Sequence, residues 1–375
     1  MKYWQKAGIG ALIILVVVTV GGTWLAKSQM PSLKKALAAE EYVPAQEQTK
    51  DKILLKAVGD IMLSRKIGTY IDANGVDYPM AQVADYLKDA DMTMGNLESP
   101  ISNNGTPLPG KGIWFRAKPE SVEALTAAGF DLLTVANNHA LDYESPALLD
   151  TLNILKTAGI TAIGGGENIS QAKKFAICQV GNVNIAVLAY SQMTDIYWDI
   201  KHPRKLAATD TLPGINPYDI NTIVADIAEA KKEADIIIVT VHWGIEYANL
   251  PEAYQRQDAY AMVDAGANVI IGHHPHVIQG VETYKDGLIA YSLGNFVFDQ
   301  EHREDARQGL VLELELSPWG WVSASFVPIY IAEGQTTFAT GSQQEKTSQL
   351  FISISEKLDT KVEKDAGKLV VKGNF

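Results

Sequence analysis

The sequence predicts an α/β fold with a largely parallel core, and three observations favour it. After residue 51, apolar runs of strand length alternate with segments of helical periodicity, which is the pattern of repeated βα units. Hydrophobic residues make up 47% of the chain and charged residues 20%, as in globular proteins. The 375 residues allow one large domain or two smaller ones.

Charge and cysteine content exclude several functions. The net charge of −12 and the pI near 5.1 argue against a nucleic-acid partner, which usually requires a basic face. The single cysteine excludes an intramolecular disulfide and a metal site built from several cysteines.

The N-terminus predicts a membrane anchor in residues 1–27. Residues 7–26 carry no charged side chain and lie between Lys6 and Lys27, which is about the length that spans a bilayer as a helix. A cleaved signal peptide is the alternative, although the cleavage-like "ALA" at 36–38 lies far beyond the apolar run. We therefore expect a single-pass membrane protein.

Three further regions follow the anchor. Residues 28–51 are polar, contain two prolines and predict a linker. Residues 52–331 hold the alternating elements and predict the main domain. Residues 332–375 predict a C-terminal extension, with an amphipathic helix at 342–361 and a short strand at 367–373.

The elements of the main domain follow from apolar periodicity and from capping residues. A proline near the start marks the helix at 119–129, and a serine, a proline and a final glycine bound the helix at 145–159. A Gly-Asn pair at 181–182 predicts a hairpin within 174–191. The other predicted helices are 79–90, 220–234 and 251–266, and the other predicted strands are 53–60, 91–98, 130–139, 235–244, 267–276, 288–299, 309–316 and 321–331.

Polar residues follow five of the apolar runs at the point where each strand should end. In an open parallel sheet, functional groups collect outside the carboxyl ends of the strands, so these side chains are expected to share one edge. The candidates are Asp60, Glu98, Asn138, His139, His242, His274 and His276.

Histidines dominate this set, since five of the seven in the chain lie at predicted strand ends. Imidazole and carboxylate ligands together suit divalent Mn, Fe or Zn. On a strand, alternate residues face one side, so His274 and His276 should face the metal while His273 points away and supports the ligands from behind. For any single histidine, the alternative is a hydrogen-bonded structural residue.

The stretch "VANNHALD" predicts a proton donor beside the metal. Asn138 offers an oxygen ligand, His139 is placed to protonate a leaving oxygen, and Asp142 is placed to orient the imidazole. The alternative is an Asx-rich turn that caps the next helix.

Three further residues are candidates. Arg65 is predicted to bind an anionic group of the substrate, with an ordinary surface arginine as the alternative. Asn295 is expected in a rim loop that lines the substrate site. Glu246 is either a support for the ligands or a surface charge.

The motifs "VGDIMLSR", "GNLE", "ANNHALDY", "HWGIEY", "GHHPHVIQ" and "YSLGNFVFD" resemble, in this order, those of the CapA/PgsA family of capsule and poly-γ-glutamate synthesis proteins. That family resembles a branch of the calcineurin-like metallophosphoesterases. The resemblance implies a β-sandwich flanked by helices (αββα), a metallophosphatase-like site with one or two metals at the strand ends, and an N-terminal transmembrane helix with the soluble domain outside the cytoplasm.

The resemblance also assigns roles residue by residue. Asp60 matches the opening metal aspartate, but Met62 stands where metallophosphoesterases have a histidine. Asn96 replaces the aspartate that bridges two metals, which makes it a supporting residue and Glu98 the substitute ligand. The remaining matches are Asn138, His242, His274 and His276 as ligands and His139 as the acid.

By this resemblance, the expected function is the biosynthesis, export or release of poly-γ-glutamate or a similar acidic capsule polymer, by metal-assisted hydrolysis or transfer. The expected partners are the membrane, the acidic polymer and other membrane subunits of a polymer synthase. Two alternatives stay open. One is a non-catalytic subunit of a membrane polymer synthase, and the other is a generic phosphodiesterase or nucleotidase.

Overall fold

The computed structural model describes residues 52–195 and 205–373. The predicted anchor and linker, residues 1–27 and 28–51, lie outside these ranges. Within them, no helix is both long enough and apolar enough to cross a bilayer.

The larger of two main sheets has strands of both directions. Its order is β17-β18-β15-β14-β1-β2-β3-β4, with β13 beside β1 and β16 beside β15. The parallel part comprises β1 (Ile53–Ile61), β2 (Met92–Leu97), β3 (Leu132–Thr134), β4 (Thr161–Ile163) and β13 (Asn295–Val297). The antiparallel part comprises β14 (Gln308–Ser317), β15 (Gly320–Ala332), β16 (Gln335–Phe338), β17 (Glu363–Asp365) and β18 (Lys368–Lys372).

The smaller main sheet has the order β11-β12-β10-β9-β7-β6. Its parallel strands are β7 (Val183–Ser191), β9 (Ile236–His242), β10 (Val269–His273) and β12 (Gly287–Ala290). Antiparallel β6 (Ala176–Val180) and β11 (Val281–Tyr284) form its edges. A separate pair joins β5 (Gly165–Gly166) to β8 (Gly214–Ile215).

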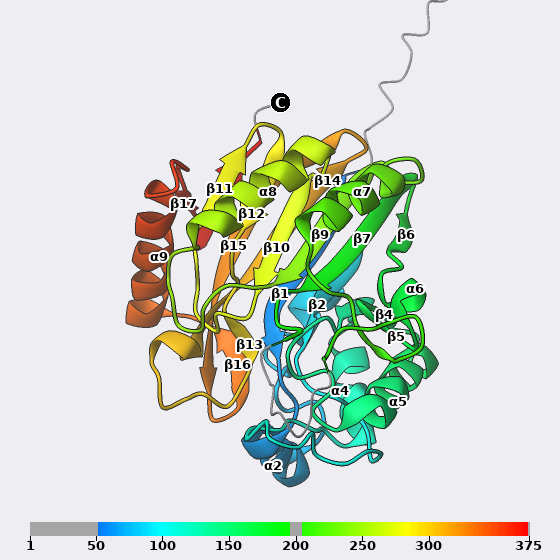
Figure 1. Ribbon diagram of the computed structural model, residues 1–375. Coiled ribbons are helices and arrows are strands. Elements are labelled where there is room, and N and C mark those ends of the chain that lie inside the picture. The colour runs from blue at the N-terminus through cyan, green and yellow to red at the C-terminus, as the bar shows by residue number, and fades with distance from the viewer. Residues whose placement is uncertain (1–51, 196–204, 374–375) are drawn as a thin grey trace, which may run out of the picture. The chain divides into compact units, whose positions relative to one another are not determined.

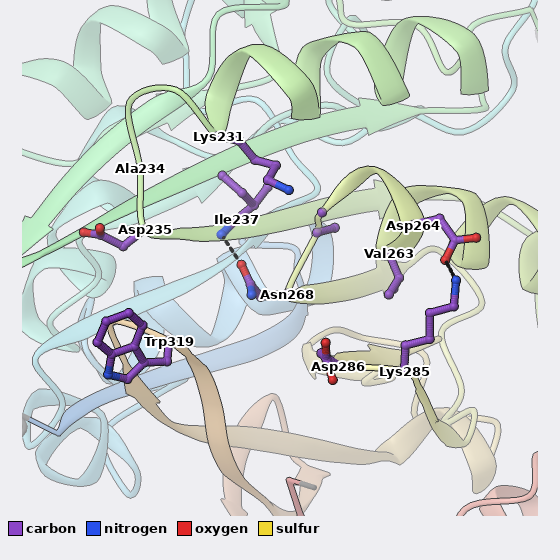
Figure 2. Close-up of a pocket in the computed structure, with 12 residues that line it drawn as sticks. Lys231, Ala234, Asp235, Ile237, Val263, Asp264, Asn268, Lys285, Asp286 and Trp319 are labelled. Carbon is purple, nitrogen blue, oxygen red and sulfur yellow. Dashed lines mark hydrogen bonds and ion pairs between the residues drawn. The ribbon is translucent and has the colours of Figure 1, made fainter. Parts of the chain in front are cut away.

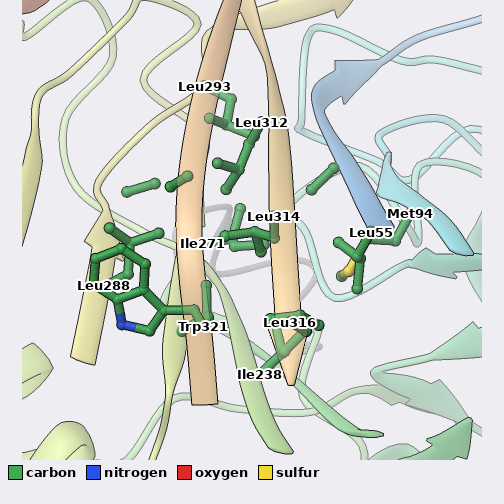
Figure 3. Packing of buried hydrophobic residues seen from close by; sticks show 14 of the residues in the cluster. Leu55, Met94, Ile238, Ile271, Leu288, Leu293, Leu312, Leu314, Leu316 and Trp321 are labelled. Carbon is green, nitrogen blue, oxygen red and sulfur yellow. The ribbon is translucent and has the colours of Figure 1, made fainter. Parts of the chain in front are cut away.

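The two main sheets pack face to face through one apolar core. Leu55 and Leu312 of the larger sheet lie in the same buried cluster as Ile238 and Ile271 of the smaller one. Figure 3 shows these side chains from both sheets between the strands. Burial of this kind contributes roughly 25 cal/mol per Å² of apolar surface, so the contact between the sheets stabilises the fold.

Helices cover the outer faces. Helices α2 (Arg65–Asn74), α3 (Ala84–Lys88), α4 (Val122–Ala127) and α5 (Glu144–Thr157) pack on the larger sheet. Helices α7 (Ile220–Ala230) and α8 (Ala253–Ala265) cover the smaller sheet and lie in front of it in Figure 1. Helix α9 (Gly341–Glu356) packs against β11 and β15. The described residues also form three short helical segments, α6 (Ile169–Ala172), η1 (Pro119–Ser121) and η2 (Asp305–Arg307).

The predicted alternation of strands and helices is confirmed, as is the hairpin at Gly181, where φ is 55°. The core is mixed rather than largely parallel, because β14 to β18 extend the larger sheet with antiparallel pairings. The C-terminal helix and strand are present as α9 and β18, and β18 belongs to the larger sheet. Several boundaries were wrong. The strand predicted at 130–139 covers only β3, the helix predicted at 79–90 is only α3, and α2 was not predicted.

One predicted strand, 288–299, is two strands in different sheets. After β12 the chain leaves the smaller sheet, turns at Gly294 with φ 72°, and enters the larger sheet as β13. The apolar residues on both sides of the turn are buried, so hydrophobicity alone gave no sign of the break.

Candidate metal centre

The carboxyl ends of parallel strands from both sheets bring the predicted ligands together. Asp60 lies near the end of β1, Glu98 directly follows β2, and His242 ends β9. His274 and His276 follow β10. These five residues, called the buried cluster below, are between 0% and 5% exposed.

An oxygen of Glu98 lacks a partner at the centre of the cluster. Among the described residues, its Oε1 atom is buried and has no hydrogen-bond partner. The Nε2 atoms of His139 and His242 lie 4.0 Å from it, and that of His276 lies 3.7 Å from it. These distances are too long for hydrogen bonds, and such donor atoms around an unpaired carboxylate oxygen fit a cation.

Asp60, Glu98 and His276 form the tightest group. Each offers one ligand atom, and these atoms lie within 4.8 Å of one another. Carboxylate and imidazole are donors that first-row divalent metals accept. The residues present therefore fit a metal ion.

Asp60 is held from several sides. Its Oδ1 atom accepts a hydrogen bond from Asn96 Nδ2 at 2.8 Å, and its Oδ2 atom accepts one from the His274 amide at 3.3 Å. His276 Nδ1 lies 3.3 Å from Oδ2. Burial opposes ionisation, but the contacts with His273 and His276 outweigh it and hold the pKa of Asp60 well below its usual range.

Asn96 lies between the two carboxylates. Its Nδ2 atom is 2.8 Å from Asp60 Oδ1 and 3.4 Å from Glu98 Oε2, while its Oδ1 atom accepts a hydrogen bond from Asn137 at 3.0 Å. The amide thus directs hydrogen atoms toward the acids. These contacts agree with the supporting role predicted for Asn96. Asn137, which the sequence reasoning did not single out, holds its orientation.

Burial and neighbouring charges set the protonation of the cluster. Burial, together with the charge of Asp60, raises the pKa of Glu98 well above its usual range. Burial lowers the pKa of His242 well below its usual range and that of His274 to about 3. His276 differs, because the Glu98 and Asp60 carboxylates outweigh its burial and raise its pKa to about 9. His242 and His274 are therefore neutral at pH 7, which is the form that binds metals.

The structure corrects the geometry predicted for the three adjacent histidines. Strand β10 ends at His273, and His274 and His276 have left-handed φ values of 98° and 59°, so strand alternation does not apply to them. Both still reach the cluster, since His274 Nδ1 lies 3.2 Å from His242 Nε2. His273 does not point away, because its Nδ1 lies 3.4 Å from Asp60 Oδ1.

Behind the cluster, His139 is held by Asp142 as predicted. His139 Nδ1 lies 2.6 Å from Asp142 Oδ2, and the imidazole stacks on Phe115 with ring centroids 3.7 Å apart. Lys111 was missed. Its buried ammonium donates to Asp142 Oδ1, lies 3.2 Å from His139 Nδ1 and donates to the Asn138 carbonyl at 2.5 Å.

Burial and the charge of Lys111 together set the pKa values of Asp142 and His139. Burial raises the pKa of Asp142 to about 7, although the ammonium of Lys111 opposes the rise. Burial and Lys111 lower the pKa of His139 well below its usual range. In the metal-free protein, the His139 imidazole is therefore neutral near pH 7.

The other predicted residues surround this centre. Asn138 Oδ1 lies 2.9 Å from His242 Nε2. Asn295 is buried, and its Oδ1 atom lies 2.9 Å from His276 Nδ1. Arg65 and Glu246 are exposed, and the Arg65 Nε donates to Asp299 at 3.0 Å. The roles proposed for these four residues stay predictions.

The fold and the buried cluster define an α/β protein with a candidate metal centre at the strand ends. The model of the family described as bacterial capsule synthesis protein PGA_cap matches residues 54–300, so the chain belongs to this family. The family expected from the motifs is confirmed.

Named relatives agree. The chain is 34% identical over 330 residues to a capsule biosynthesis protein CapA of Bacillus anthracis, covering 86% of this chain and 75% of the relative. It is 34% identical over 325 residues to a PGA biosynthesis protein CapA of Bacillus subtilis, covering 86% and 80%. A probable polyglutamine synthesis accessory protein of Mycobacterium tuberculosis is 27% identical over 271 residues, covering 69% and 70%.

Solved structures are only distantly similar. A hypothetical protein from Thermus thermophilus aligns with a TM-score of 0.40 and 16% identity, covering 76% of this chain and 96% of that one. A 5′-nucleotidase from Candida albicans aligns with a TM-score of 0.39 and 12% identity, covering 82% and 59%.

Replacing Glu98 by Gln is expected to lower the metal affinity of the purified full-length protein by at least about 100-fold, because a ligand charge is lost at the centre of the cluster. Elemental analysis after equilibrium dialysis against Mn²⁺ or Zn²⁺ measures this. Asn96→Ala should lose less, and Glu229→Gln, on the exposed face of α7, is the matched control. Full metal content in Glu98→Gln, together with loss in Asn96→Ala, would refute the assignment.

Replacing Lys111 by Met is expected to cost roughly 3 kcal/mol of stability at pH 9, because it leaves a buried carboxylate without its cation. Without Lys111 the pKa of Asp142 rises further above about 7. Asp142 then resists ionisation in the folded state but not in the unfolded state. The loss of stability in the variant therefore grows as the pH rises from 6 to 9. Denaturant unfolding of chelator-treated protein measures it. Lys111→Met/Asp142→Asn should recover most of the loss, and a deficit independent of pH would contradict the pairing.

Proposed function

We propose that this chain is a membrane-anchored, extracytoplasmic protein that uses a divalent metal in the buried cluster to hydrolyse or transfer an acidic capsule polymer such as poly-γ-glutamate. The observation that carries the proposal is the unpartnered Glu98 Oε1 atom, with three imidazole nitrogens around it. The names of the relatives supply the polymer.

The metal, Mn, Fe or Zn, would be held by Asp60, Glu98, His242 and His276, with His274 and Asn138 beside them. When bound, it supplies electrophilic activation of a carbonyl or phosphoryl oxygen and of water. Among the residues that the structure describes, one compact group is present, that of Asp60, Glu98 and His276, and it supports one ion. A second ion would need other ligands, because the bridging aspartate expected by resemblance is Asn96 here.

His139 is the proton donor in this proposal. Its Nε2 atom is directed at Glu98, and Asp142 and Lys111 fix its Nδ1 side. An anionic substrate group next to the ring favours the imidazolium and raises its low pKa, so binding of substrate prepares the acid. The Phe115 ring excludes water from one imidazole face.

A second candidate function is a non-catalytic subunit of a membrane polymer synthase that binds metal or polymer. The low pKa of His139 in the metal-free protein favours this alternative, because a neutral imidazole is a poor proton donor. Metal binding without turnover would distinguish the two functions.

His139→Gln is expected to retain metal but to lose turnover by about 10²- to 10⁴-fold, because only proton transfer is removed. The assay uses detergent-purified full-length protein loaded with Mn²⁺ or Zn²⁺ and follows the chain length of poly-γ-glutamate by gel electrophoresis, with a chromogenic phosphodiester in parallel. The exposed His302→Gln is the control. Unchanged turnover in His139→Gln would remove this residue as the acid.

A metal-loaded wild-type protein that cleaves neither substrate would instead establish the non-catalytic alternative. Loss of metal in His139→Gln would make His139 a ligand. Cleavage of the phosphodiester alone would favour the generic phosphodiesterase.

The protein is expected in the membrane fraction with its N-terminus intact, because residues 7–26 form an uncharged run of spanning length. Cell fractionation, N-terminal sequencing and protease accessibility of whole cells measure this. A soluble product beginning near Ala39 would show cleavage and contradict the anchor.

A further inference from the structure

A cleft with a volume of about 180 Å³ opens at the same edge of the larger sheet as the buried cluster. Leu63 and Ser64, which lie two and three residues after the end of β1, form one part of its lining. The start of α2 and the segment from Arg116 to Ser121 form the rest. We call it the basic cleft, because its charged lining residues are Arg65, Arg116, Lys118 and Asp72.

A stack of side chains connects the basic cleft to His139. The guanidinium of Arg65 lies 4.4 Å from the centroid of the Phe115 ring. The Phe115 ring also lies against the His139 imidazole, with centroids 3.7 Å apart and an angle of 15° between the planes. The side chains of Arg65 and Phe115 thus separate a ligand in the cleft from the predicted proton donor.

The charge of the cleft differs from that of the whole chain. The chain carries a net charge of −12, which repels a polyanion, whereas three cations and one carboxylate line the cleft. Arg65 is paired with Asp299 outside the lining, so Arg116 and Lys118 are the cations available to a ligand. Figure 2 shows a contrasting hollow, where Lys231 and Lys285 are outnumbered by three aspartates, at positions 235, 264 and 286. The lining charges therefore favour an acidic polymer at the basic cleft over that hollow.

The cations in the cleft can accept an external carboxylate. Lys118 pairs with Asp72 at 2.6 Å, but the two side chains are 64% and 53% exposed, and such surface pairs exchange partners at little cost. The Arg116 guanidinium lies 3.8 Å from the Tyr143 ring centroid and donates to the Asn104 carbonyl at 3.4 Å. Its fork of five N–H donors leaves others for a carboxylate.

We propose that the basic cleft is a subsite for the side-chain carboxylates of the acidic polymer, and that Arg116 and Lys118 hold the polymer at the edge of the sheet where the buried cluster lies. The inference rests on the proposed function for the class of polymer but not for catalysis. It places recognition of the polymer charge outside the buried cluster, on two exposed residues that are not candidate metal ligands.

The test is equilibrium binding of fluorescently labelled poly-γ-glutamate to detergent-purified full-length protein in EDTA at low salt, where neither metal nor turnover contributes. Arg116→Glu/Lys118→Glu should raise the Kd by at least about tenfold, because two attractive charges become repulsive. Arg116→Gln/Lys118→Gln should have a smaller effect in the same direction. Thermal melting checks that both variants are folded.

The matched control is Lys361→Glu/Lys372→Glu. These lysines line another cleft, and Lys361 pairs with Glu363 at 2.7 Å as Lys118 pairs with Asp72. Three results would overturn the subsite. Polymer binding could weaken equally in the two double Glu variants, it could weaken in neither, or the esterified, uncharged polymer could bind as tightly as the charged one. Binding that depends on the cleft without any cleavage by metal-loaded protein would uphold it and would count only against catalysis.

Discussion

The site depends on the point where the chain crosses from one sheet to the other. At Gly294, between β12 and β13, the backbone passes so close to β1 that a Cβ at Gly59 would lie 1.8 Å from the Gly294 carbonyl oxygen. That oxygen accepts a hydrogen bond from the Asp60 amide at 3.1 Å. The next residue, Asn295, is the register partner of Asp60 and also contacts His276. One crossing therefore fixes a carboxylate of the larger sheet against an imidazole that follows a strand of the smaller one.

This crossing holds the Asp60 carboxylate in a buried position beside Glu98. Asp60 and Glu98 are both fully buried, and the imidazole with a raised pKa beside them is that of His276. Asn96 lowers the free-energy cost of burying the two acids, because its side-chain amide directs hydrogen atoms at both. Buried carboxylates need a compensating cation. Both acids lie at the edge where several strands end. The arrangement favours binding of a metal over a purely structural role.

The sequence allowed much of this edge to be predicted, and its limits have physical causes. Asp60, Glu98 and His242 were found because each interrupts an apolar run. The relation between His139 and Asp142 was also found, because the two lie three residues apart in one turn. The strands of a sandwich share one apolar pattern, however, so periodicity could not assign them to two sheets or show the break at Gly294. The buried position of Lys111 could not be predicted, because a lysine in a glycine-rich loop is normally exposed to solvent.

The long separation of the ligands along the chain has a consequence for biogenesis. Asp60 and His276 are more than 200 residues apart, and β14, which pairs with β1, ends at Ser317. A chain that emerges in stages from a ribosome or a translocation channel therefore has no complete binding pocket until almost all of it is available. Contacts between residues so far apart in the sequence form slowly. A metal held by the buried cluster would then be acquired late, after folding, from the compartment in which folding ends.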